Sequence, residues 1–226
     1  MRTLERLAYS LTRLPRHLVE RSTAPPELRS VMPYTMVSRQ RLENLRALAA
    51  QAIAEQVPGD FVECGTWKGG SGALLAQQAV LARPPRLTWF CDSYQGLPQA
   101  GRADGWFAQL WTGKVQATPD DVRSALAALG LSDDHVRIVA GWFDQTLPQL
   151  DVGSIALLHV DCDWYDSVLC CLDNLWDRVS PGGFVIFDDY GYWPGCRQAV
   201  DEFLARIGLA DQLVRVDATG RYLRKP

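Results

Sequence analysis

The sequence predicts an α/β fold in which helices cover both faces of a mostly parallel β-sheet. Segments typical of strands alternate with segments typical of helices along most of the chain, which is the pattern of a doubly wound sheet. Acidic residues also follow several of the strand-like segments, and such a sheet binds its ligands beyond the carboxyl ends of its strands. With 226 residues, of which 47% are hydrophobic, the chain can bury one core of domain size.

The first 33 residues are predicted to form an amphipathic helix and a linker, ahead of a domain over residues 34–226. Leucines near the start of the chain recur at spacings of three and four, which places them on one helix face. They are Leu4, Leu7, Leu11, Leu14 and Leu18. We expect this helix to pack on the domain or on a second subunit. Residues 22–33 are rich in proline and polar residues, which is typical of a connector.

Local patterns predict each element of the domain. Ser38 is placed to cap the first helix, and Gly130 to end a later one. Residues 94–119 are rich in glycine and tryptophan, so we expect a long loop there, of the kind that forms lids or binding sites. The other elements are expected as helices over 39–56, 71–82, 119–130, 166–179 and 196–208, strands over 61–65, 86–93, 135–141, 154–164 and 182–191, and an antiparallel hairpin over 212–225.

Composition argues against several classes of protein. The net charge is −3 and no dense run of lysine and arginine is present, so nucleic acid is not an expected partner. No stretch of 18 or more apolar residues occurs, so no membrane-spanning helix is expected. The six cysteines form no C-x-x-C pair, which favours buried thiols over a zinc site or a disulfide framework. We therefore expect a cytoplasmic protein.

A predicted strand runs through Glu63 directly into a glycine-rich turn, FVECGTWKGG at residues 61–70. Such a turn lets a ligand approach the backbone and aims N–H groups at it. The dinucleotide fingerprint and the phosphate-loop lysine are both missing, which leaves S-adenosylmethionine as the alternative ligand. Glu63 could then face its ammonium group, and Asp92, on the next strand, could take the ribose hydroxyls. The competing interpretation is that Glu63 caps a helix and Asp92 starts a turn.

Seven blocks of sequence resemble one known family. They are YTMVSRQRLENL, VPGDFVECGTWKGG, CDSYQGLP, GWFDQTLP, HVDCDWYDS, SPGGFVIFDDYG and PGCRQAVDEF, in this order between residues 34 and 205. The chain thereby resembles the macrocin O-methyltransferase family of class I S-adenosylmethionine-dependent methyltransferases. The resemblance implies a Rossmann-like, seven-stranded, mostly parallel sheet with a C-terminal antiparallel hairpin. It also implies methylation of a hydroxyl with a divalent metal such as Mg²⁺, usually on a sugar of a natural product, and a homodimer.

The resemblance further implies roles for individual residues. The residues expected to hold the methyl donor are Glu63, Gly65, Thr66, Ser71, Asp92, Ser93, Gly141, Trp142, Phe143 and Asp161. The metal is expected at Asp161, Asp188 and Asp189, and the general base is expected to be Asp161 or Asp163. His159 lies on the same strand face as Asp161 and is a further candidate, with a structural role as its alternative.

A metal at these acids agrees with their chemistry. Oxygen ligands suit a hard cation such as Mg²⁺, and crowded carboxylates without a cation would repel one another. The alternative is that Asp163 or Asp166 only caps the following helix. Two other functions remain open at this point. One is a metal-dependent O-methyltransferase of a catechol or phenolic acceptor, and the other is a non-catalytic scaffold that binds S-adenosylmethionine.

Overall fold

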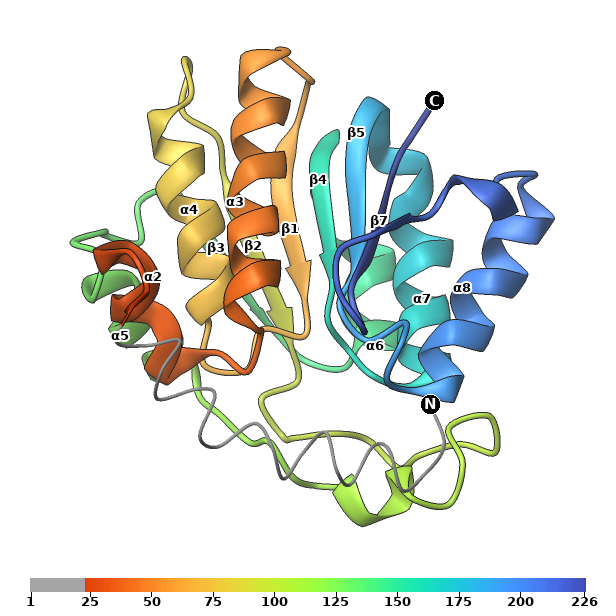
Figure 1. Cartoon of the computed structure of the whole chain (residues 1–226). Coiled ribbons are helices and arrows are strands. Elements are labelled where there is room, and N and C mark those ends of the chain that lie inside the picture. The colour runs from red at the N-terminus through yellow and green to blue at the C-terminus, as the bar shows by residue number, and fades with distance from the viewer. Residues whose placement is uncertain (1–22) are drawn as a thin grey trace.

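The structure, a computed structural model, describes residues 23–226, which build a seven-stranded sheet of order β3-β2-β1-β4-β5-β7-β6 (Figure 1). The strands are β1 (Asp60–Cys64), β2 (Thr88–Asp92), β3 (Val136–Ala140), β4 (Ile155–Val160), β5 (Val179–Phe187), β6 (Val214–Arg215) and β7 (Arg221–Arg224). Strands β1 to β5 are parallel, whereas β7 is antiparallel to both β5 and β6. The predicted sheet and its C-terminal hairpin are therefore confirmed.

Helices cover both faces of the sheet. They are α2 (Pro26–Val31), α3 (Arg39–Ala54), α4 (Gly70–Leu81), α5 (Pro119–Ala127), α6 (Phe143–Thr146), α7 (Tyr165–Leu175) and α8 (Pro194–Arg206). Helices α3, α4 and α5 lie on one face, and α7 and α8 lie on the other (Figure 1). Successive side chains of a strand point to opposite faces, so Phe61 packs in the cluster under α3 and Val62 packs in the cluster under α7. Within residues 23–226, no helix is long and apolar enough to cross a membrane.

The segment predicted as a connector contains a helix that packs into the core. Leu28 and Val31 of α2 are fully buried, in a cluster with Leu74 and Val122 of the neighbouring helices. Proline is favourable at the first position of a helix, so Pro26 starts α2 and does not mark a linker. The connector prediction is therefore wrong for this stretch. The predicted leucine helix at residues 4–18 lies outside the described residues.

The register of the parallel strands places their carboxyl ends at one edge. Each strand is joined to the next by a hydrogen bond just beyond its last residue. These bonds run from Gly65 N to Cys91 O (2.9 Å), from Gly141 N to Asp92 O (2.9 Å), from Asp161 N to Cys64 O (2.9 Å) and from Asp188 N to Val160 O (3.1 Å). Strands β4 and β5 are neighbours, as a common site for Asp161 and Asp188 requires.

The long irregular loop predicted after β2 is confirmed, with one short 3-10 helix at Ala108–Trp111. This loop caps α7. Asp104 accepts hydrogen bonds from Tyr165 N (2.8 Å) and Gly101 N (2.7 Å), whereas α7 has no side-chain cap from its own first residues. The alternative in which Asp163 or Asp166 serves only as the helix cap is therefore not what the structure has.

Candidate functional site

A cavity of about 520 Å³ opens at the carboxyl edge of the sheet. Its size falls within the range of roughly 300–1,000 Å³ that is usual for small-molecule sites. The walls come from the β1–α4 turn, the ends of β2, β4 and β5, the loop after β2, and α6. The predicted site residues that line it are Gly65, Thr66, Ser71, Asp92, Ser93, Trp142, Phe143, Asp161, Asp163, Asp188 and Asp189. Three other candidate residues are not among the described residues that line the cavity. They are Glu63, Gly141 and His159.

The glycine-rich turn after β1 is fastened by Asp92. One carboxylate oxygen of Asp92 accepts hydrogen bonds from Thr66 N and Trp67 N, both at 2.8 Å, and the other accepts from Tyr94 N at 2.7 Å. Burial raises the pKa of Asp92, although these backbone hydrogen bonds act against the shift. The alternative in which Asp92 starts a turn is thus observed. A contact of Asp92 with ribose hydroxyls stays a prediction.

At Gly65 the turn passes very close to the backbone at the end of β4. Its φ is +85°, and a Cβ built on it would lie 1.8 Å from the backbone oxygen of Asp161. Any side chain would therefore push the turn and the end of β4 apart. The conformation needs glycine for two independent reasons, the positive φ and the close approach of the two backbones.

We expect Gly65→Ala to abolish binding of S-adenosylmethionine and to destabilise the fold. Isothermal titration with the methyl donor, together with urea unfolding, checks both effects. Gly130→Ala is the matched control, because Gly130 has a φ of +69° but nothing within 4 Å of its Cβ position. That variant should lose only about 1–2 kcal/mol, which is the cost of left-handed backbone. Equal behaviour of the two variants would show that the close approach is unimportant.

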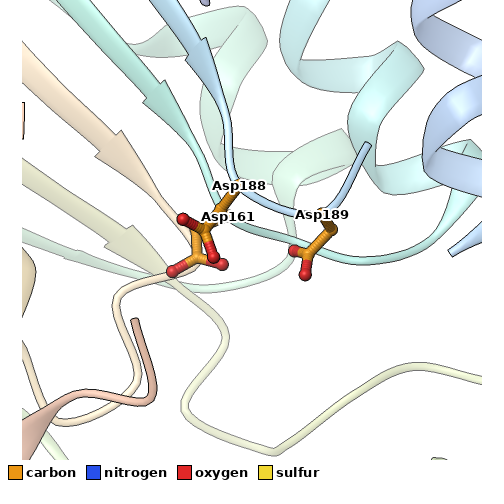
Figure 2. Close-up of side chains that lie close together, drawn as sticks. All are labelled: Asp161, Asp188 and Asp189. Carbon is orange, nitrogen blue, oxygen red and sulfur yellow. The ribbon is translucent and has the colours of Figure 1, made fainter. Parts of the chain in front are cut away.

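Three carboxylates converge at the ends of β4 and β5. One oxygen each of Asp161, Asp188 and Asp189 lies within 4.8 Å of the others. Figure 2 shows Asp161 and Asp188 side by side, with Asp189 on the same side of the chain. Burial, followed by the charges of Asp188 and Asp189, raises the pKa of Asp161 well above its usual value. The structure therefore brings the predicted set of metal-binding acids together at the cavity.

Arg41 of α3 is a member of the site that the sequence analysis missed. Its guanidinium binds the side chain of Asp188 and donates to the backbone oxygen of Asp188 at 3.1 Å, and its Nε lies 3.3 Å from Asp217. Its side chain is only 5% exposed. Burial alone would lower the pKa of Arg41, but Asp188 and Asp217 raise it, so the group is cationic. Its signal in the sequence is an arginine on the same helix face as Leu45 and Leu48.

Glu63 and His159 form a buried pair behind the cavity wall. Glu63 Oε1 lies 2.9 Å from His159 Nδ1, while His159 Nε2 lies 3.8 Å from Asp188. Burial alone would lower the pKa of His159, but its hydrogen bonds with Asp188 and Glu63 raise it to about 9. The other oxygen of Glu63 faces Gly72, whose Cβ position is 2.5 Å away. Neither side chain lines the cavity, which differs from the expectation that Glu63 faces the methyl donor.

The chain itself supplies cations to the acidic cluster. From the sequence alone, the carboxylates are expected to repel one another unless a bound cation lies between them. Arg41 and protonated His159 both contact Asp188, so part of this negative charge is balanced from within the fold. The charge of Arg41 also interacts favourably with Asp189 and Asp161. Repulsion among these carboxylates is therefore a weaker argument for a metal than the sequence suggests, because cations of the fold already balance part of their charge.

Asp163 is held in an unusual conformation at the cavity. Its φ is +61°, a left-handed value that is uncommon for residues other than glycine and that often occurs at functional sites. Burial and the charge of Asp189 raise the pKa of Asp163 well above its usual value, and a hydrogen bond with Trp193 opposes this shift. Of the three candidate bases, Asp161 and Asp163 line the cavity and His159 does not.

Comparisons with known proteins agree with this architecture. The family model of the macrocin O-methyltransferases matches residues 13–225. The chain is 39% identical over 199 residues to the 8-demethyl-8-(2,3-dimethoxy-alpha-L-rhamnosyl)-tetracenomycin-C 4'-O-methyltransferase of Streptomyces olivaceus, which covers 84% of this chain and 75% of that relative. It is 36% identical over 201 residues to the demethyldecarbamoylnovobiocin O-methyltransferase of Streptomyces niveus, covering 85% and 76%.

A solved structure extends the similarity to three dimensions. The O-methyltransferase NovP superposes with a TM-score of 0.77 at 36% identity, over 85% of this chain and 82% of that chain. The sheet order, the cavity at its carboxyl edge and the match along nearly the whole sequence lead to one conclusion. The chain belongs to the macrocin O-methyltransferase family and is an S-adenosylmethionine-dependent O-methyltransferase.

Proposed function

We propose that the protein methylates a sugar hydroxyl of an antibiotic-type natural product, with a divalent cation held by Asp161, Asp188 and Asp189. The observation that carries the proposal is the convergence of these carboxylates on one side of a cavity of about 520 Å³. The Streptomyces olivaceus relative supports the choice of acceptor, because its name places a rhamnosyl group on its substrate.

The methyl donor is assigned to the half of the cavity formed by β1, β2 and α6. Gly65 and Thr66 offer backbone at the turn, and Ser71 lies in the first turn of α4, which has no side-chain cap. The N–H groups at such a helix start suit a carboxylate. Trp142 and Phe143 line the same half and present apolar surface for the adenine.

The residues present fit a hard divalent cation. All three ligands are carboxylates, and each has an oxygen within 4.8 Å of the others, which agrees with the oxygen preference of Mg²⁺. When bound, such a cation would lower the pKa of an acceptor hydroxyl and fix its position. Arg41 would hold Asp188 in place through its hydrogen bond to Oδ2 of that carboxylate.

Asp163 is assigned as the general base. A base must accept a proton near neutral pH, and burial raises the pKa of Asp163 in that direction. Asp161 has a similar shift, but it is assigned to the cation, which ties up its charge. The methyl donor is already activated, so the other contribution of the protein is to align the hydroxyl with the transferred methyl group.

A phenolic acceptor is the second candidate, because Trp111, Trp164 and Trp193 line the cavity and aromatic rings pack well on aromatic walls.

Mass spectrometry after incubation with a panel of glycosides and catechols separates the sugar acceptor from the phenolic acceptor. We expect one added methyl group on glycosides and loss of product after EDTA treatment, with recovery on adding Mg²⁺. Methylation of catechols alone would contradict the sugar proposal. Undiminished turnover in EDTA would contradict the metal.

A further inference from the structure

We propose that a row of aromatic side chains binds the aglycone of the acceptor, and that this aglycone is apolar and contains a flat ring. The row consists of Trp193, Phe107 and Trp106, and Leu110 follows Trp106 by four residues in the same loop. The row leads from the cavity to the protein surface. The proposal rests on the proposed function, since it concerns the group to which the methylated sugar is attached.

The inner end of the row is a fixed aromatic cluster. Trp193 precedes α8, is 4% exposed and lines the cavity. Its ring centroid lies 4.7 Å from that of Trp164 and 4.8 Å from that of Tyr192, and both contacts are edge to face. It also stacks on Phe107, with a centroid distance of 5.9 Å and an interplanar angle of 29°. Trp111 packs against the same indole at 6.5 Å. Contacts from several sides hold this ring in one orientation.

This cluster is directly tied to the reacting end of the cavity. The hydrogen bond between Trp193 and Asp163 joins the inner ring of the row to the proposed base. An acceptor sugar placed at the acids would therefore lie beside Trp193. Because the acids line the cavity, the group attached to the sugar must extend away from them toward the surface, and the aromatic row beginning at Trp193 offers it a path.

The outer end of the row is exposed. Trp106 packs edge to face on Phe107 at 5.9 Å, yet it remains 66% exposed, and Leu110 is 55% exposed. Large exposed apolar side chains are few in residues 23–226, and the other three are Met36, Leu81 and Val214. Two such side chains four residues apart, next to cavity-lining Trp111, indicate a binding surface.

The turn over residues 105–113, which carries Trp106, Phe107 and Leu110, supports the assignment of this surface to the aglycone. Gly105 and Gly113 bracket the turn with φ values of +79° and +72°, and a Cβ on either would meet nothing within 4 Å. The backbone at Gly113 is nevertheless held in place, because Gly113 N donates to Leu97 O (2.8 Å) and Leu97 N donates to Lys114 O (2.9 Å). The contact of Phe107 with Trp193 also holds this turn against a ring that lines the cavity, and the exposed Trp106 packs on Phe107.

The test compares binding of two glycosides that share one sugar. The probes are 4-nitrophenyl α-L-rhamnoside and methyl α-L-rhamnoside, and isothermal titration to the full chain measures their Kd values without any turnover. We expect the wild type to prefer the aryl glycoside and Trp106→Ala to reduce this preference roughly tenfold. Trp106→Phe should keep most of it. Leu81→Ala, which removes a side chain that is 61% exposed on α4, is the matched control and should retain it.

Two results would overturn the proposal. One is an equal Kd for both glycosides in the wild type, or an unchanged preference in Trp106→Ala. The other is a change of oligomeric state in Trp106→Ala, measured by light scattering, with its preference intact, which would assign this surface to a contact between copies. Failure of the proposed function is separately visible, because it would show as missing methyl transfer to either glycoside while the binding preference persists.

Discussion

Asp189→Asn is expected to lower kcat by roughly 10²–10⁴-fold, the range that loss of acid–base or metal assistance typically costs. Asparagine keeps the size of the side chain but loses the charge that a hard cation requires. The backbone oxygen of Asp189 accepts hydrogen bonds from Tyr192 N and Trp193 N, and the substitution leaves these in place. Affinity for S-adenosylmethionine and thermal stability should therefore stay near wild-type values. Steady-state kinetics, donor titration and Mn²⁺ titration measure the three effects.

Two comparisons sharpen this prediction. Asp151→Asn removes an exposed acid near the opposite edge of the sheet, just before β4, and should leave kcat unchanged. Asp188→Asn should also abolish chemistry with little loss of donor binding, but it should in addition destabilise the fold, because Arg41 then loses its main partner. Normal turnover of Asp189→Asn or Asp188→Asn in chelator would show that no metal acts at these carboxylates.

The strands and the edge they share could be predicted from the sequence because their signals are local. A buried strand, a turn and a capped helix each occupy one short window, and the direction of a parallel sheet then decides where Asp161 and Asp188 meet. The same locality explains the error at α2. A proline-rich window marks either a connector or the first position of a helix, and only the packing of Leu28 and Val31 decides between them.

The charge network of the site could not be predicted, because it depends on strand order and on contacts distant in sequence. Glu63 pairs with His159 across neighbouring strands β1 and β4, in a register that aligns these two residues. In the sequence, the position of Glu63 beside a glycine-rich turn indicates a contact with a ligand. In the folded sheet, Glu63 instead pairs with His159. Arg41 is 147 residues from Asp188, so no local pattern links them.

Arg41→Met is expected to destabilise the protein without bound metal by about 3–5 kcal/mol, the usual cost of leaving a buried charge without its partner. Asp188 is 4% exposed, and without Arg41 it would still have His159 as a nearby cation, at the longer distance of 3.8 Å. Methionine fills much of the volume of the arginine stem, so lost charge should outweigh lost packing. Thermal unfolding in EDTA measures this loss. Arg41→Lys should fall between the variant and the wild type, because lysine keeps the charge and loses the forked geometry.

The same variant tests whether Arg41 and a divalent cation act on one set of carboxylates. An ion that binds only the folded state stabilises it more as its affinity and concentration rise, and a site with one positive charge fewer should bind Mg²⁺ more tightly. The same increase in Mg²⁺ concentration should thus raise the melting temperature of Arg41→Met more than that of the wild type. An equal rise in both proteins would show that the cation binds elsewhere. If Mg²⁺ raises the melting temperature of neither protein, the proposed metal site at these carboxylates is wrong. The ion pair of Arg41 and Asp188 would then be their main structural support.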